Sequence, residues 1–240
     1  MNKNSNLYIV IYSTVMVVVV ATLLAVASLS LQGRQKANML DEKKQAILSS
    51  LSLNGQNYDE VIEAFVVNEK GEKIEGDPIQ LLFDLPTAFA ENTLPVFQAA
   101  DGRIVVPVSG VGLWGPMWGY VALEKDMNTI SGIVLDHAGE TPGLGAEVAT
   151  AKHQAMYKGK TLFEGEEFVS VTLRKGGAKD PNHEVDAISG GTKTSDGVTA
   201  MLKSSLGAYL PLLKVSAVAP CCEECAEATE CETNNVANNE

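Results

Sequence analysis

The segment from Asp186 to Thr192 carries the most evident chemistry of this sequence. It contains one carboxylate, two hydroxyls and two adjacent glycines, and apolar residues at helical spacing follow it. Gly190 and Gly191 let the backbone approach a ligand closely and adopt positive φ angles. Ser189 and Thr192 offer hydroxyls, and the free N–H groups at the start of a helix favour an anion. The segment is therefore suited to holding a phosphate, although an ordinary turn before a capped helix has the same residue types.

The same segment resembles the flavinylation motif Asp-x-x-Ser/Thr-Gly-Ala-Thr. This motif occurs in a family of FMN-carrying membrane subunits that includes the C subunit of the Na⁺-translocating NADH:quinone reductase and the G subunit of the related Rnf complex. The matching positions are Asp186, Ser189, Gly190 and Thr192. Gly191 departs from the motif, since alanine is usual there. The resemblance implies that a flavin transferase esterifies FMN to Thr192, with FAD as donor and AMP as leaving group. From chemistry alone Thr194 and Ser195 are rival acceptors, and the register of the motif selects Thr192.

Two other stretches are similar to the C subunit. One is rich in glycine and aromatic residues and runs from Gly112 to Tyr120, and the other runs from Glu140 to Gly145. The resemblance covers residues 7–213, and the tryptophan stretch favours the C subunit over the Rnf counterpart. It implies that Thr141 and Leu144 lie beside the flavin. From the residues alone, the second stretch is equally a Pro-Gly turn before a helix.

The resemblance implies an electron carrier that has no catalytic residue of its own. Such a protein relays electrons through covalent FMN, from an iron–sulfur centre in neighbouring membrane subunits to the flavin of the B subunit. The whole complex oxidises NADH, reduces a quinone and exports Na⁺. Residues 110–115 have the Gly-x-Gly-x-x-Gly spacing of a dinucleotide-binding fingerprint after a predicted strand, but the next predicted element is another strand and not a helix. The apolar span has no ionisable residue. The alternatives are an Rnf-type subunit, an anchored domain that binds flavin reversibly, and a purely structural subunit.

Three more side chains near these stretches have two interpretations each. Trp114 and Trp118 can stack on a flavin ring, or they pack in the core beneath a glycine-rich turn. Lys193 either offsets the charge of a phosphate or faces solvent. The three histidines lie far apart in the sequence and show no spacing typical of metal ligands.

Residues 7–31 form an uncharged run that exceeds the ~20 residues needed to cross a bilayer as a helix. The small residues Ala25 and Ala27 also fit a cleaved signal peptide, but the run is longer than an h-region of about 7–15 residues. We therefore expect a single-span anchor after a short tail, residues 1–6. The positive-inside rule applied to Arg34 and the lysines after it places the domain in the cytoplasm. The resemblance instead implies the periplasmic side of a bacterial inner membrane.

The soluble part is predicted to be an α+β domain with a mostly antiparallel sheet and packed helices, because strand patterns outnumber helical ones. Residues 32–53 are predicted to be a helical connector and residues 54–215 the FMN-binding domain. Pro107 favours a sheet edge or a strand end. The apolar spacing predicts a helix over residues 144–157, and Ser195 is the expected N-cap of the helix after the motif.

The composition limits the partners of the chain. The 240 residues have a formal net charge of −12 with 30 acidic residues, which argues against a nucleic-acid partner. Residues 216–240 are rich in Cys, Glu and Asn and are predicted to be a disordered appendage. Its four cysteines could in principle hold zinc or a cluster, but disulfides or idle thiols fit equally well. No metal is assigned, because no hydrophobic frame surrounds them. These cysteines are Cys221, Cys222, Cys225 and Cys231.

Overall fold

The computed structural model describes residues 6–217, which divide between two compact units, residues 1–46 and residues 47–240. Almost all of the predicted tail 1–6 and most of the tail 216–240 lie outside the described residues. The four cysteines, Cys221, Cys222, Cys225 and Cys231, are therefore also outside them.

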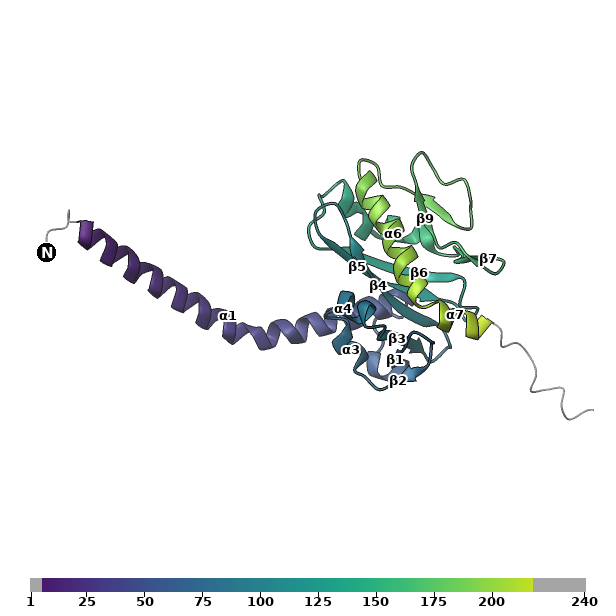
Figure 1. The fold of residues 1–240 in the computed structure, drawn as a ribbon, viewed down its shortest axis with the longest axis horizontal. Coiled ribbons are helices and arrows are strands. Elements are labelled where there is room, and N and C mark those ends of the chain that lie inside the picture. Colours follow the sequence, from purple (N-terminus) through teal and green to yellow (C-terminus); the bar gives the residue numbers. More distant parts are fainter. Residues whose placement is uncertain (1–5, 218–240) are drawn as a thin grey trace, which may run out of the picture. The chain divides into compact units, whose positions relative to one another are not determined.

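Helix α1 (Asn6–Ser50) forms the described part of the first unit, and its last four residues belong to the second (Figure 1). It is one continuous helix over the predicted span and over the predicted connector as far as Ser50. By length and composition it can cross a membrane: its most apolar window has a mean hydropathy of 2.7, and none of that window is buried. Hydroxyls within the span return to the helix backbone, as when Thr14 donates to the Val10 carbonyl at 2.8 Å and Thr22 to the Val18 carbonyl at 2.8 Å. A polar side chain can therefore lie in lipid without an unpaired donor.

The second unit is built on a six-stranded antiparallel sheet in the order β2-β1-β3-β4-β5-β6. Its strands are β1 (Ile62–Val67), β2 (Lys73–Ile74), β3 (Leu94–Ala99), β4 (Ile104–Val111), β5 (Pro116–Leu123) and β6 (Ile130–His137). Two small ladders complete the strands, antiparallel β7 (Phe163–Glu164) with β8 (Glu167–Phe168), and parallel β9 (Thr172–Arg174) with β10 (Glu184–Asp186). The predicted α+β class with a mostly antiparallel sheet is confirmed.

Pro107 lies inside β4, an internal strand, and not in an edge strand as its residue type suggested. The pairing of β4 with β3 nevertheless ends at Val105, which lies opposite Phe97, while the pairing with β5 continues through Pro107 opposite Tyr120. The missing N–H of proline therefore falls where β4 has neighbours on one side only. The edge prediction rested on the fact that proline cannot donate a hydrogen bond to a neighbouring strand, and that reason still applies at this position in β4.

Short helices connect the strands. They are α2 (Tyr58–Val61), α3 (Pro78–Leu81), α4 (Leu85–Ala90), η1 (Gly145–Ala149), α5 (Ala151–Gln154) and η2 (Ala155–Tyr157). The single helix predicted over residues 144–157 is thus three short pieces. Thr150 ends the first piece and caps the second, and its hydroxyl accepts from the His153 N–H at 3.4 Å.

Helix α6 (Thr192–Ala208) lies across the sheet and packs on β4, and α7 (Leu210–Ala217) follows it (Figure 1). Glycines make the close approach possible. A Cβ on Gly110 would lie 2.6 Å from the Met201 Cβ, and one on Gly197 would lie 2.5 Å from the Val111 carbonyl oxygen. The helix can therefore sit close to the end of β4, which brings its N-terminus to the turn between β4 and β5.

Helix α6 begins at Thr192, not after Ser195 as the sequence suggested. Gly191 is the N-cap and supplies no side-chain hydrogen bond. Ser195 lies within the first turn, donates its hydroxyl to the Gly191 carbonyl at 2.9 Å and accepts from the Ile188 N–H at 3.0 Å. These two hydrogen bonds connect the loop before α6 to the first turn of the helix, and Thr192 is the first helical residue.

An ion pair closes the loop between β9 and β10. Glu184 accepts from the Arg174 Nε at 2.5 Å and from the Lys179 N–H at 2.8 Å. Hydrogen bonds from the Arg174 guanidinium, reinforced by the backbone N–H groups of Lys179 and Asp180, lower the pKa of Glu184 from its usual 4.5 to about 2. The charged form of Glu184 therefore stabilises the folded loop.

We expect Glu184→Gln to lower the melting temperature at neutral pH, and the difference from wild type to disappear as the pH falls towards 2. A depressed carboxyl pKa contributes stability that is fully present above about pH 4.5 and is lost as the pH passes through the folded pKa. Thermal unfolding of both proteins from pH 7 to pH 2 measures the effect. Glu167→Gln, at an exposed glutamate, is the charge-matched control. A difference that is independent of pH would contradict the prediction.

Candidate functional site

Three stretches that are distant in the sequence meet around one cavity of about 180 Å³ in the second unit. The first is the turn between β4 and β5, the second follows β6, and the third is the N-terminus of α6. The lining residues are Leu113, Trp114, Glu140, Thr141, Leu144, Gly145, Gly190, Gly191, Thr192, Lys193 and Thr194. The structure thus brings together all three stretches that resembled the C subunit.

The N-terminus of α6 offers backbone donors to this cavity. Gly191 has no side chain to cap the helix, and within residues 6–217 the N–H groups of Thr192, Lys193 and Thr194 have no acceptor. Such unpaired N–H groups, together with the positive end of the helix dipole, favour a bound anion. Lys193 is exposed and adds a cation beside them.

The three hydroxyls in the first turn of α6 differ in access. Thr194 and Ser195 are each 1% exposed, and both donate, Thr194 to the Glu140 carboxylate at 2.6 Å and Ser195 to the Gly191 carbonyl. Thr192 is exposed, and its hydroxyl makes no hydrogen bond within the part of the chain that the structure describes. Only Thr192 among the three can meet a bulky reagent without rearrangement.

Glu140 is the buried anchor of the site, at 5% exposure. Its Oε1 accepts from the Trp114 N–H at 2.9 Å, and its Oε2 accepts from the Thr194 hydroxyl at 2.6 Å. Burial alone would raise the pKa of Glu140, but hydrogen bonds from Thr194 and from the Trp114 and Leu113 amides outweigh it, so the pKa lies below its usual value. One ionised carboxylate therefore joins the β4–β5 turn to α6.

Two glycines make room for that carboxylate. A Cβ on Gly112 would collide with the Glu140 Oε1, and a Cβ on Gly145 would collide with Oε2 and lie 2.6 Å from the Thr194 Oγ1. Sequence reasoning singled out Thr141 and Leu144 in this stretch and missed Glu140. One indication of its importance was present in the sequence: Glu140 is an acidic residue that lies two positions before the Pro142-Gly143 pair.

Asp186 and Ser189 of the motif do not line the cavity. Asp186 ends β10, and its Oδ1 accepts from the Ala178 N–H at 2.8 Å, so it fastens the glycine-rich loop before β10 and does not contact Thr192. Ser189 is exposed. The motif therefore has two parts in the structure. Asp186 holds the loop before β10, and Gly190, Gly191 and Thr192 line the cavity.

Apolar side chains rim the cavity. Trp114 is 68% exposed, and Leu113 and Leu144 are exposed as well. Trp114 is thus not packed in the core, one of its two interpretations, whereas Trp118 is half-buried and does not line the cavity. Exposed aromatic and aliphatic surface beside an anion site suits a ligand that has a charged end and a flat apolar ring.

Comparisons with known proteins agree with this arrangement. A family model described as the FMN-binding domain matches residues 112–207, which contain all the residues lining the cavity. The C subunit of the Na⁺-translocating NADH-quinone reductase of Vibrio vulnificus YJ016 is 32% identical over 210 residues, covering 75% of this chain and 82% of that protein. This chain belongs to the C-subunit family of Na⁺-translocating NADH-quinone reductases. The identification made from the motifs is confirmed.

Other members of the C-subunit family support the same conclusion. The crystal structure of the C subunit from Parabacteroides distasonis has a TM-score of 0.72 and 44% identity, and the match covers 76% of this chain and 96% of that one. The protein from Neisseria meningitidis serogroup A is 42% identical over 114 residues, which cover 47% of this chain and 44% of that protein. This chain thus matches less than half the length of the Neisseria relative.

The residues at the cavity fit FMN, the cofactor of the domain that this family contains. The unpaired N–H groups, Lys193 and the two glycines suit its phosphate, and the exposed apolar rim suits its ring. A volume of about 180 Å³ is below the roughly 300–1,000 Å³ of ordinary ligand pockets, so the cavity encloses only part of such a molecule.

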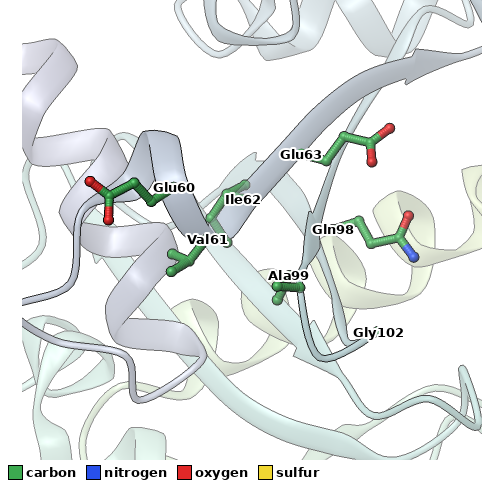
Figure 2. A pocket seen from close by; sticks show the side chains of 8 residues that line it. Glu60, Val61, Ile62, Glu63, Gln98, Ala99 and Gly102 are labelled. Carbon is green, nitrogen blue, oxygen red and sulfur yellow. The ribbon is translucent and has the colours of Figure 1, made fainter.

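Two larger cavities of this C-subunit protein suit a phosphate less well. A cavity of about 370 Å³ lies at the start of β1, where Glu63 and Gln98 extend to the same side from paired strands and Glu60 adds a second carboxylate (Figure 2). A cavity of about 580 Å³ is lined by Asp126, Glu166 and Lys214 among others. Carboxylates within a few ångströms repel an anion. The cavity at α6 also contains a carboxylate, Glu140, but both of its oxygens accept hydrogen bonds, and unpaired N–H groups of the α6 N-terminus face the same cavity. These donors, and not the volume, favour the site at α6.

The side chain of Ile188 explains why this chain has a glycine at position 191, where the motif of its family has alanine. A methyl group on Gly191 would lie 2.9 Å from the Ile188 Cγ2 and 3.1 Å from the Ile188 Cβ. Ile188 is buried and β-branched, so it has little freedom to move away. The isoleucine already occupies the space that an alanine would need.

Restoring the alanine of the motif is therefore expected to destabilise this chain. We expect Gly191→Ala to cost about 1 kcal/mol, from overpacking and from a poorer N-cap, and to lower the melting temperature by about 2–4 °C. Thermal unfolding measures this. The cost should shrink in an Ile188→Ala background, and a melting temperature that is unchanged or higher in the single variant would contradict the account.

Proposed function

We propose that this chain is the electron-carrying subunit of a membrane Na⁺-translocating NADH:quinone oxidoreductase, with FMN joined by a phosphoester to Thr192. The observation that carries the proposal is that Thr192 presents an exposed hydroxyl, without a hydrogen bond to any described residue, at a helix N-terminus that no side chain caps. The Thr192 oxygen attacks the phosphorus of FAD next to the ribityl chain. The new O–P bond replaces the pyrophosphate bond, AMP leaves, and the hydroxyl proton is released. A separate flavin transferase catalyses this step.

The chain itself binds and orients the cofactor. The backbone N–H groups of Lys193 and Thr194 would hold the phosphate, and Gly190 and Gly191 would let the loop lie against it. The backbone at position 190 has a φ of +73°, which glycine adopts readily and other residues rarely do. Thr141 and Leu144 form the opposite wall. When bound, FMN supplies reversible electron uptake, while the chain supplies its position and electrostatic surroundings.

A covalent bond suits a domain on the outer side of the membrane. We assign the chain to the bacterial inner membrane, with α1 as a single-pass anchor and the FMN-binding domain on the periplasmic side. Free flavin there is dilute, so a dissociable cofactor would be lost by mass action. The partners are the iron–sulfur and flavin-bearing membrane subunits of the complex, between which this chain relays electrons, and the flavin transferase during maturation.

The test is whether flavin remains on the denatured chain and where it is attached. The full chain is expressed with a flavin transferase, boiled in SDS and examined for in-gel flavin fluorescence, and the fluorescent tryptic peptide is then sequenced. We expect a fluorescent band whose modified peptide contains Thr192. Flavin that is released on boiling would support reversible binding instead, and a modified peptide without Thr192 would place the bond elsewhere. A parallel sample made without the transferase is the control and should not fluoresce.

A further inference from the structure

Glu140 is a buried carboxylate that the proposed attachment chemistry does not use. It accepts one hydrogen bond from the β4–β5 turn and one from α6, at 2.9 and 2.6 Å, and two glycines are required to enclose it. Among the residues lining the cavity, it is the one that contacts both of the other stretches through side-chain hydrogen bonds. Glu140 therefore connects the β4–β5 turn to α6 before any cofactor is present.

We propose that Glu140 is a positioning residue for flavin attachment, which holds the Thr194 hydroxyl inward and the Trp114 turn in place so that Thr192 alone is presented to the transferase. The inference rests on the proposed function, because it concerns how that site is prepared. The carboxylate accepts from the buried Thr194 hydroxyl and from the part-buried Trp114 N–H. Without it the Thr194 hydroxyl would lose its acceptor in a site that water does not reach.

The Glu140–Thr194 contact also resembles a general base beside its nucleophile. Access argues against that role. Thr194 is 1% exposed, and Gly145 stands so close that a methyl group on it would lie 2.6 Å from the Thr194 Oγ1. An incoming phosphorus atom needs more room than a methyl group. Glu140 therefore keeps Thr194 from reacting, although it accepts a hydrogen bond from that hydroxyl.

Glutamine in place of Glu140 provides a specific test, because it keeps the shape but has only one oxygen to accept. In Glu140→Gln, the Trp114 N–H and the Thr194 hydroxyl compete for that oxygen, and the amide adds donors of its own. In Glu140→Gln/Thr194→Val the hydroxyl is gone, so the amide oxygen can serve the Trp114 N–H alone. A positioning role therefore predicts that the second substitution rescues the first. If Glu140→Gln only impaired folding, adding Thr194→Val would instead make the defect worse.

The first measurement uses the full chain made without the transferase. Amide hydrogen exchange at Trp114 should quicken about tenfold in Glu140→Gln, equivalent to losing about 1.4 kcal/mol of protection, and should return towards the wild-type rate in the double variant. Glu147→Gln, which neutralises an exposed glutamate on η1, is the control and should leave Trp114 exchange unchanged. Equal exchange in wild type and Glu140→Gln would overturn the proposal.

The second measurement is the initial rate of flavin attachment with FAD and purified transferase. Glu140→Gln should react about tenfold more slowly, the double variant should recover most of that loss, and the control Glu147→Gln should react at the wild-type rate. A double variant as slow as Glu140→Gln, or a Glu140→Gln chain as fast as wild type, would overturn the positioning role and leave the attachment to Thr192 standing. A wild-type chain that takes up no flavin would overturn the proposed function itself, and the positioning role with it.

Discussion

Thr192→Ala is expected to carry no covalent flavin, while Thr192→Ser carries it at the wild-type position. The expected loss is complete, because the phosphoester needs the oxygen that alanine lacks and because the two other hydroxyls in the first turn of α6 are buried and engaged. Thr194 donates to Glu140, and Ser195 donates to the Gly191 carbonyl. In-gel flavin fluorescence after SDS treatment, normalised to protein stain, measures the effect in cells that contain a flavin transferase.

The loss must be separated from unfolding. Thr192 is exposed, and its hydroxyl makes no hydrogen bond within the described residues, so Thr192→Ala should change stability by no more than about 0.5 kcal/mol. Melting temperatures of the flavin-free proteins check this. Ser189→Ala, which removes the other exposed hydroxyl of the motif, serves as the comparison for transferase recognition. Fluorescence that persists in Thr192→Ala would exclude Thr192 as the acceptor, and peptide mapping would then decide among Thr194, Ser195 and Ser189.

The general plan of the fold could be predicted from the sequence, because apolar runs, turns and the uncharged span follow local rules. The sheet class and the long N-terminal helix depend on residue types that are close together in the chain. The boundaries depended on contacts that are not local. Ser195 looked like an N-cap, yet its hydroxyl binds the Gly191 carbonyl from within the first turn, and the helix begins at Thr192. The role of Pro107 depended on where the neighbouring strand stops pairing.

The candidate site was partly visible in the sequence for the same reason. The Gly190–Thr192 segment has the residue types of a phosphate loop, and the resemblance to the C-subunit family supplied the register. Glu140 was missed because its importance comes from partners 26 and 54 residues away. Asp186 was assigned to the attachment motif by the resemblance, as part of the recognition signal or as a residue that positions the Thr192 hydroxyl, and the sequence did not reveal that its side chain accepts from the Ala178 N–H. Spacing along a chain predicts which residue types are present, but it does not tell which atoms they contact.

The packing of α6 against the end of β4 gives the second prediction with a large expected effect. Gly197→Ala should destabilise the domain, although helix propensity alone predicts the reverse. Replacing a glycine inside a helix by alanine is worth up to about 1 kcal/mol of stabilisation. At Gly197 the new methyl group would lie 2.5 Å from the Val111 carbonyl oxygen and 3.1 Å from the Met117 Cε. Overpacking of this kind costs about 1–3 kcal/mol, and a backbone atom cannot turn aside as a flexible side chain can.

The same helix contains its own control. A Cβ on Gly207 would meet only the Phe168 ring, at an ordinary 3.8 Å, so Gly207→Ala should gain the propensity term without the collision. We expect thermal unfolding to show a melting temperature several degrees lower for Gly197→Ala and slightly higher for Gly207→Ala. The collision partner Val111 directly precedes the turn that Glu140 holds, so flavin attachment should also slow in Gly197→Ala and not in Gly207→Ala. Two variants that shift stability in the same direction would show that propensity, and not the close approach of α6 to β4, governs this helix.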